Sequence, residues 1–171
     1  MLSCQSNSEL NIQGHRGCRG LYPENSLPAF KKAIELGVNT IELDLAISKD
    51  KQVVVSHEPF MKSDYCLDAN GNDIAKEDEL NYNFYQIPYD SIRQFDCGSK
   101  YFTKFPKQNK VKVYKPLLSE VIELSESLNS NIYYNIEIKS DSRYDNIYFP
   151  APKEYVDLVL KEINKYNIGN R

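Results

Sequence analysis

Hydrophobic and polar residues alternate in two segments of this chain, at residues 40–48 and residues 131–139. Successive side chains of a β-strand point to opposite faces, so each segment predicts a strand with one apolar face and one polar face. The polar face of the first strand carries Glu42 and Asp44, and that of the second carries Glu137. The alternation therefore places three carboxylates on strands.

Apolar residues recur at helical spacing in three other segments, each of which predicts an amphipathic helix. The first helix begins after Asn25 or Ser26, either of which can cap it, and ends at Gly37. The other two are expected at residues 116–128 and 152–166. The positions expected to face the core are Leu27, Phe30, Ala33 and Ile34, then Leu117, Val121, Leu124 and Leu128, then Tyr155, Val156, Val159, Leu160 and Ile163.

A hairpin is predicted where the strand at residues 40–48 turns back into an apolar run at residues 53–57. If Asp50 and Lys51 form a two-residue turn, Asp44 lies directly opposite His57 on the same face of the sheet. Such turns favour glycine where this chain has Lys51, and a longer turn would shift the register.

The order of strands and helices, starting from a short strand at residues 10–14, indicates an α/β protein with mostly parallel strands. Polar side chains at the ends of such strands face the mouth of a closed barrel, and a complete barrel takes about 250 residues. We therefore expect the N-terminal portion of a TIM-type (β/α)8 barrel at residues 11–171. A polar segment at residues 1–10 precedes it, and an insertion of loops and short elements occupies about residues 59–115.

The formal net charge of −3 argues against a nucleic-acid-binding protein, because such proteins present basic surfaces to phosphates. No apolar run approaches the roughly 18 residues needed to span a bilayer. The expected partner is therefore a small molecule, and the oligomeric state stays open.

The four cysteines, Cys4, Cys18, Cys66 and Cys97, include no C-x-x-C pair, so no zinc or thioredoxin-like motif is indicated. Their disulfide pairing stays open. The residues around Cys4 resemble the junction where a bacterial lipoprotein signal ends, which predicts a lipid anchor at Cys4 on a periplasmic or cell-surface protein. The alternative is a polar terminus with a chance cysteine, which leaves a cytoplasmic location open.

Three carboxylates, Glu42, Asp44 and Glu137, are expected to converge near the strand ends, where their mutual repulsion requires a cation. A hard divalent metal with oxygen ligands, Mg²⁺ or Ca²⁺, would neutralise them. The alternative is an ordinary ion-pair network in which Lys139 and surface lysines balance the same charges.

The two histidines of the chain, His15 and His57, each follow a strand that runs toward the same mouth. Two imidazoles across a scissile bond can serve as general base and general acid. Arg16 adds a guanidinium suited to phosphate oxygens. Either histidine alone would more often be structural, but together with the carboxylates the set indicates phosphodiester cleavage.

Four motifs appear in order: "GHRG" at residues 14–17, "PENS" at 23–26, "IELDLAISKDKQVVVSHE" at 41–58 and "IEIKS" at 136–140. Together they closely resemble the glycerophosphodiester phosphodiesterase family. The resemblance implies a phosphatidylinositol-phospholipase-C-like barrel, a divalent metal, and hydrolysis of glycerophosphodiesters to glycerol 3-phosphate and an alcohol in lipid and glycerol metabolism.

The resemblance also implies a role for each matching residue. His15 and His57 are the catalytic acid–base pair, Glu42, Asp44 and Glu137 ligate the metal, Arg16 and Lys139 hold the phosphate, and Glu24 and Asn25 support the site. The chain departs from the family pattern at Lys51, where glycine is usual, and at Glu58, where aspartate is usual.

Two alternatives to this hydrolase remain. One is phospholipase-type cleavage of a phospholipid or sphingolipid headgroup on the same barrel, and the other is a non-catalytic fragment that retains the fold. The presence of every expected histidine and carboxylate argues against the second. From the missing barrel half we expect the 171 residues alone to be inactive.

Overall fold

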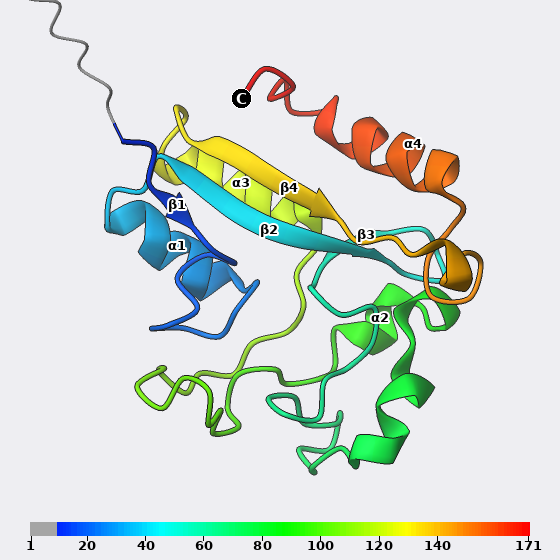
Figure 1. Ribbon diagram of the computed structural model, residues 1–171. Coiled ribbons are helices and arrows are strands. Elements are labelled where there is room, and N and C mark those ends of the chain that lie inside the picture. Colours follow the sequence, from blue (N-terminus) through cyan, green and yellow to red (C-terminus); the bar gives the residue numbers. More distant parts are fainter. Residues whose placement is uncertain (1–9) are drawn as a thin grey trace, which may run out of the picture.

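A four-stranded sheet lies at the centre of the computed structural model, which describes residues 10–171 (Figure 1). Its strands are β1 (Gln13–Gly14), β2 (Thr40–Ile47), β3 (Val53–Val55) and β4 (Tyr133–Ile138). β2 pairs in parallel with β1 and with β4, and antiparallel with β3. The predicted α/β class with mostly parallel strands is confirmed, although β1 is shorter than the expected strand.

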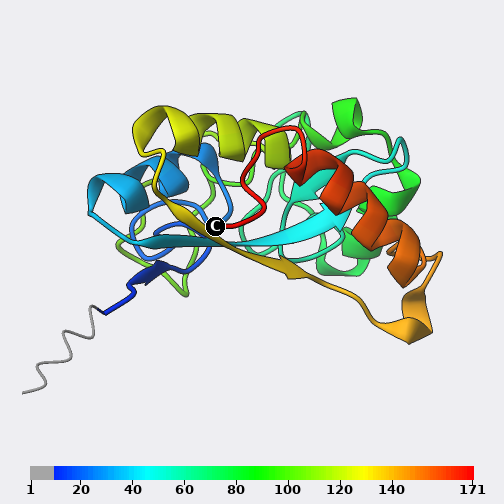
Figure 2. The same ribbon diagram turned by 90° about the horizontal axis from the view of Figure 1, so that it is seen from above.

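Three longer helices cover one face of this sheet, as the view from above shows (Figure 2). They are α1 (Leu27–Glu35), α3 (Leu118–Leu128) and α4 (Pro152–Ile163). Their side chains bury the apolar face of β2, so the polar face of the same strand is left for Glu42 and Asp44. No helix among the described residues is both long and apolar enough to cross a membrane.

The first helix begins and ends as its sequence predicts. Ser26 caps α1 by accepting a hydrogen bond from the Ala29 amide, and Gly37 follows its end with a φ of +81°. Leu27 and Ile34 pack against the core that fully buried Phe30 and Ala33 help to form.

The predicted buried faces of the other two helices are only partly correct. α3 buries Leu118, Val121 and Ile122, whereas Leu128 is exposed, because α3 packs against both α1 and the sheet and its contact face is rotated toward position 118. In α4, Val156 and Leu160 are exposed, while the predicted Tyr155 and Val159 are buried and Ile163 packs against the core.

The predicted hairpin register is wrong by one residue. The observed pairs are Leu45 with Val55, Ala46 with Val54 and Ile47 with Val53. Asp44 therefore lies opposite Ser56, whose amide donates to the Asp44 carbonyl at 2.9 Å, and not opposite His57. The physical reason is a three-residue turn that ends at Lys51, which adopts a left-handed φ of +61°.

Residues 59–115, the predicted insertion, contain loops and three short elements: η1 (Lys76–Tyr82), η2 (Phe84–Gln86) and α2 (Tyr89–Ile92). The insertion is nevertheless packed, because it forms a second hydrophobic cluster with Ala46 and Val54 of the sheet. The cluster members from the insertion are Met61, Tyr65, Cys66, Ile74, Phe84, Tyr89, Ile92, Phe95 and Cys97. A short 3-10 helix, η3 (Ser142–Tyr144), follows β4.

A disulfide joins Cys66 to Cys97 within this second cluster, and Cys18 is a free thiol. Cys4, the predicted lipid-anchor residue, lies outside the described residues. The disulfide spans 31 residues, and closing a loop of that length restricts the unfolded chain.

Replacing Cys66 and Cys97 together with alanine is expected to lower the free energy of unfolding by about 3–4 kcal/mol, the loop-closure value for this span. Urea denaturation followed by tyrosine fluorescence measures the change. Dithiothreitol should destabilise the natural chain and leave the double variant unaffected. Equal stability of the two proteins would show that the insertion does not depend on the bond.

Candidate active site and metal centre

Three carboxylates meet on the polar face of the sheet. Glu42 and Asp44 lie on β2, and Glu137 lies on β4 directly opposite Asp44. One oxygen from each of the three side chains lies within 4.8 Å of the others. Glu42 and Asp44 are buried, whereas Glu137 is about half exposed, at 53% of its side chain. The parallel pairing of two alternating strands therefore brings together the residues that the sequence predicted as one set.

Asp44 is the most enclosed of the three, with 1% of its side chain exposed. Asn25 Nδ2 donates to Asp44 Oδ2 at 2.9 Å, and Arg16 Nε lies 3.2 Å from the same oxygen. Burial alone would raise the pKa of Asp44, but the Asn25 hydrogen bond and the charges of Arg16, His57 and Lys139 together lower it. Asp44 is therefore ionised inside the protein.

The other oxygen, Asp44 Oδ1, is buried and makes no aligned hydrogen bond to any described residue. Lys139 Nζ lies 3.2 Å away without that alignment. Burial raises the pKa of Glu42 more than the Arg16 amide lowers it, and the Asp44 charge raises it further. A buried oxygen with unused lone pairs, beside a second carboxylate that is costly to ionise, fits a hard divalent cation.

The spacing of the three oxygens is consistent with that ligand set. Calcium–oxygen bonds are about 2.3–2.6 Å long, so one ion can contact oxygens on opposite sides that lie about 5 Å apart. Carboxylate oxygens are also the donors that Mg²⁺ and Ca²⁺ prefer. The residues present therefore fit such an ion.

The loop after β1 brings Arg16 to these carboxylates. Its amide donates to Glu42 Oε2 at 2.7 Å, and its Nη1 donates to Glu24 Oε1 at 2.6 Å. Arg16 has a left-handed φ of +52°, and a Cβ on Gly17 would lie 2.7 Å from the Ala29 carbonyl carbon. The glycine that follows Arg16 is thus required for the loop to pack on α1.

Glu24 and Asn25 join this loop to the metal site. The Asn25 amide donates to the Arg16 carbonyl at 3.0 Å, and Asn25 has a left-handed φ of +53°. Asn25 is fully buried and its side chain is held by Asp44, while Ser26 provides the helix cap. Of the two capping candidates, Ser26 caps the helix, and the Asn25 side chain instead positions the Asp44 carboxylate.

The two histidines lie near the carboxylates in different surroundings. His15 Nε2 lies 3.8 Å from Glu42 Oε2, and 56% of its side chain is exposed. His57 follows β3, 30% of its side chain is exposed, and its Nδ1 lies 3.0 Å from Glu58 Oε1. Although the predicted hairpin pairing of Asp44 with His57 is wrong, His57 still lies close enough to lower the pKa of Asp44.

Lys139 forms ion pairs with Glu137 Oε1 at 2.5 Å and with Asp44 Oδ1 at 3.2 Å. Part of the predicted ion-pair alternative is therefore present, since one lysine contacts two of the three carboxylates. Among the described residues Lys139 makes no ion pair with Glu42. Its charge therefore does not balance the third carboxylate.

Sequence reasoning missed three side chains that border the site: Tyr65, Arg19 and Lys115. Arg19 Nη1 lies 3.7 Å from Glu24 Oε2. Tyr65 and Lys115 belong to the insertion, and both are buried. Residues 59–115 show no clear periodicity, so no sequence signal indicated that either would reach the site.

Residues 15–170 match the model of the glycerophosphoryl diester phosphodiesterase family. The chain is 32% identical over 160 residues to a glycerophosphodiester phosphodiesterase of Caldanaerobacter subterraneus, a match that covers 94% of this chain and 55% of that protein. It is 34% identical over 125 residues to human lysophospholipase D, covering 73% of this chain and 35% of the relative.

The fold is also found among solved structures. The crystal structure of a protein from Silicibacter pomeroyi, described as a putative glycerophosphoryl diester phosphodiesterase, superposes with a TM-score of 0.83 at 28% identity, covering 94% of this chain and 55% of that one. The chain thus spans about half the length of the curated relatives it matches, and its sheet and helices correspond to part of their barrel.

Proposed function

Because the chain belongs to the glycerophosphoryl diester phosphodiesterase family, we propose that the whole protein hydrolyses glycerophosphodiesters to glycerol 3-phosphate and an alcohol. The observation that carries the proposal is the grouping of Glu42, Asp44 and Glu137, with His15 near Glu42 and His57 within electrostatic reach of Asp44. These are the side-chain types that phosphodiester cleavage needs.

In this proposal Glu42, Asp44 and Glu137 hold a divalent ion, Mg²⁺ or Ca²⁺, which when bound polarises phosphoryl oxygens. Arg16 and Lys139 contact the phosphate of the substrate. Glu24 and Asn25 keep Arg16 and Asp44 in place through the hydrogen bonds described above.

The two histidines transfer the protons. One takes the proton of the substrate's own glycerol hydroxyl, whose oxygen then attacks phosphorus in line, while the other protonates the departing alcohol oxygen. The products of this step are a cyclic glycerophosphate and the free alcohol. Water then opens the ring by the reverse proton transfers and gives glycerol 3-phosphate.

The direct test is to incubate the whole protein with glycerophosphocholine and glycerophosphoethanolamine in the presence of Mg²⁺ or Ca²⁺. Glycerol 3-phosphate is measured with glycerol-3-phosphate dehydrogenase, and the alcohol separately. Release of both products in equal amounts supports the proposal. Absence of turnover on both substrates with either ion would contradict it.

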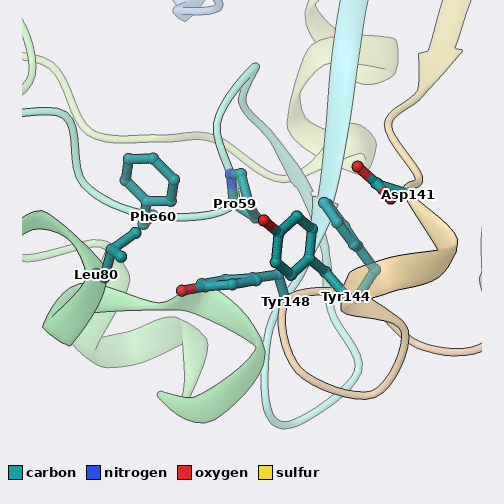
Figure 3. A pocket seen from close by; sticks show the side chains of 7 residues that line it. Pro59, Phe60, Leu80, Asp141, Tyr144 and Tyr148 are labelled. Carbon is teal, nitrogen blue, oxygen red and sulfur yellow. The ribbon is translucent and has the colours of Figure 1, made fainter.

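An apolar pocket next to the site favours lysophospholipid headgroup cleavage as a second candidate function. Figure 3 shows the pocket, which has a volume of about 480 Å³. Pro59 and Phe60 come shortly after His57, and Asp141 comes shortly after Lys139, so two pocket walls continue from candidate site residues. The lining residues are Pro59, Phe60, Leu80, Asp141, Tyr144, Tyr148 and Phe149.

The pocket is suited to an acyl chain more than to a cationic alcohol. Asp141 is paired with Arg143, whose guanidinium also lies 5.4 Å from the Tyr144 ring centre, and Lys62 lies 5.7 Å from the Phe60 ring centre. Two cationic groups thus already lie against lining residues, while most of the lining side chains are aromatic. A monoacyl glycerophosphodiester would bury its chain there.

Tyr148→Ala is expected to lower kcat/KM for lysophosphatidylcholine by about tenfold, the effect of losing about 1.4 kcal/mol of apolar contact. Turnover of glycerophosphocholine should be nearly unchanged. Tyr101→Ala, which removes a half-exposed tyrosine that does not line the pocket, serves as the control. An equal loss on both substrates would argue that the pocket does not bind an acyl chain.

A further inference from the structure

A continuous chain of polar contacts leads from His57 into the insertion. His57 Nδ1 lies 3.0 Å from Glu58 Oε1, and the Tyr65 hydroxyl donates to Glu58 Oε2 at 2.9 Å. Lys115 Nζ in turn donates to the Tyr65 hydroxyl at 3.4 Å. Both oxygens of the Glu58 carboxylate are therefore engaged, one by the histidine and one by the tyrosine.

The chain becomes more buried with distance from the site. His57 and Glu58 are partly exposed, with 30% and 21% of their side chains accessible, whereas Tyr65 is 7% and Lys115 is 1% exposed. Water therefore reaches the histidine end and is excluded from the lysine end. An unpartnered charge on Lys115 would be costly in that position. The Tyr65 hydroxyl and the nearby charges of Glu24 and Glu58 offset that cost.

The charges along this chain favour an ionised Glu58. Burial acts to raise the pKa of Glu58, but the hydrogen bond to His57 and the nearby charge of Lys115 lower that pKa to about 2. Burial lowers the pKa of Lys115, and the charges of Glu24 and Glu58 oppose that shift.

The two inner members are themselves fixed by the fold. Tyr65 precedes a disulfide cysteine, and its ring lies 5.3 Å from that of Phe102. The Tyr89 hydroxyl donates to the Lys115 carbonyl at 3.2 Å. The carbonyl of Pro116, the next residue, accepts from the Val55 amide of β3 at 2.7 Å. The contacts that hold Glu58 therefore come from the packed insertion.

A carboxylate on one ring nitrogen of a histidine determines where the ring proton resides. With Nδ1–H donated to Glu58, the Nε2 atom carries the lone pair that accepts or returns a proton, and the carboxylate stabilises the imidazolium once it forms. Without such a partner the two neutral tautomers interconvert, and one of them presents no base at Nε2.

We propose that Glu58, held by Tyr65 and Lys115, is a positioning residue that keeps His57 in its Nδ1–H tautomer with Nε2 available for proton transfer. The kinetic consequence rests on the function proposed above. The tautomer of His57 is a property of the protein whether or not it hydrolyses glycerophosphodiesters. The tautomer proposal and the proposed function can therefore fail separately.

The tautomer is tested by ¹⁵N NMR of the histidine rings in the full chain, at a pH where His57 is neutral. The ring signals absent from a His57→Gln sample belong to His57. In the natural protein we expect a protonated Nδ1 and an unprotonated Nε2. In Glu58→Gln we expect ring signals averaged between the two tautomers, since the amide can both donate and accept.

The kinetic test uses the whole protein with glycerophosphocholine. Glu58→Gln is expected to reduce kcat by about 10- to 100-fold, the usual effect of removing a partner that orients a histidine, while KM changes little. Glu58→Asp restores a carboxylate and should recover part of the rate. Glu77→Gln, an exposed glutamate on η1, is the matched control and should match the natural protein.

Two inner variants keep the inference testable if Glu58→Gln folds poorly. Tyr65→Phe removes one donor to Glu58 and Lys115→Met removes the buried charge, so each should shift the His57 ring signals and lower kcat, with Lys112→Met as the exposed control. A protonated Nε2 in an active natural protein overturns this inference alone. Unchanged kcat and ring signals in folded Glu58→Gln, or in both inner variants, also overturn it.

Discussion

Replacing either His57 or His15 with alanine is expected to lower kcat of the whole protein on glycerophosphodiesters by about 10²- to 10⁴-fold, the range for losing one positioned proton-transfer group. His57 lies within electrostatic reach of Asp44, and His15 lies 3.8 Å from Glu42, so the two imidazoles are near different carboxylates. An attacking hydroxyl and a departing alkoxide each need their own proton transfer. In the proposed mechanism, therefore, neither histidine replaces the other.

The measurement is single-turnover release of glycerol 3-phosphate and of the alcohol, with circular dichroism to verify folding. Because His15 is half exposed and His57 is partly exposed, neither substitution opens a large core cavity. If both single variants retain full activity, the acid–base mechanism is wrong. Loss in one variant only would assign both proton transfers to a single histidine.

Removal of the divalent ion with EDTA is expected to abolish turnover, a decrease of at least about 10³-fold, because a bound cation supplies several kcal/mol of charge stabilisation. The substitution that tests the site most cleanly is Glu137→Gln. Glu137 is about half exposed on β4 and its one ion-pair partner among the described residues is Lys139, so its loss should not disturb the fold.

We expect Glu137→Gln to weaken binding of Ca²⁺ or Mg²⁺, measured by isothermal titration calorimetry, and to lower activity in proportion to the unbound fraction. Excess metal should restore part of that activity. Glu77→Gln, which removes an exposed carboxylate from η1, should bind metal like the natural protein. Full activity after complete chelation, or unchanged metal affinity in Glu137→Gln, would exclude these carboxylates as the ion's ligands.

The amino-acid sequence by itself determined the polar face of the sheet. The alternation in β2 and β4 assigns Glu42, Asp44 and Glu137 to one face, because the period of a strand leaves only two choices of side. Local signals also predicted α1, since Ser26, Pro28 and Gly37 act within one or two turns of the helix ends.

The tertiary structure decided what depends on long-range packing. A three-residue turn ending at Lys51 shifted the hairpin by one residue, and the contacts of the Lys51 side chain with Tyr85 and Glu154 help to offset the cost of its left-handed φ. Contacts between distant segments leave no periodic pattern, so the buried Lys115 beside Tyr65 could not be read from residues 59–115. Packing of that insertion against β3 brought Tyr65 and Lys115 to Glu58. From the sequence alone, Glu58 is only a departure from the family pattern next to His57.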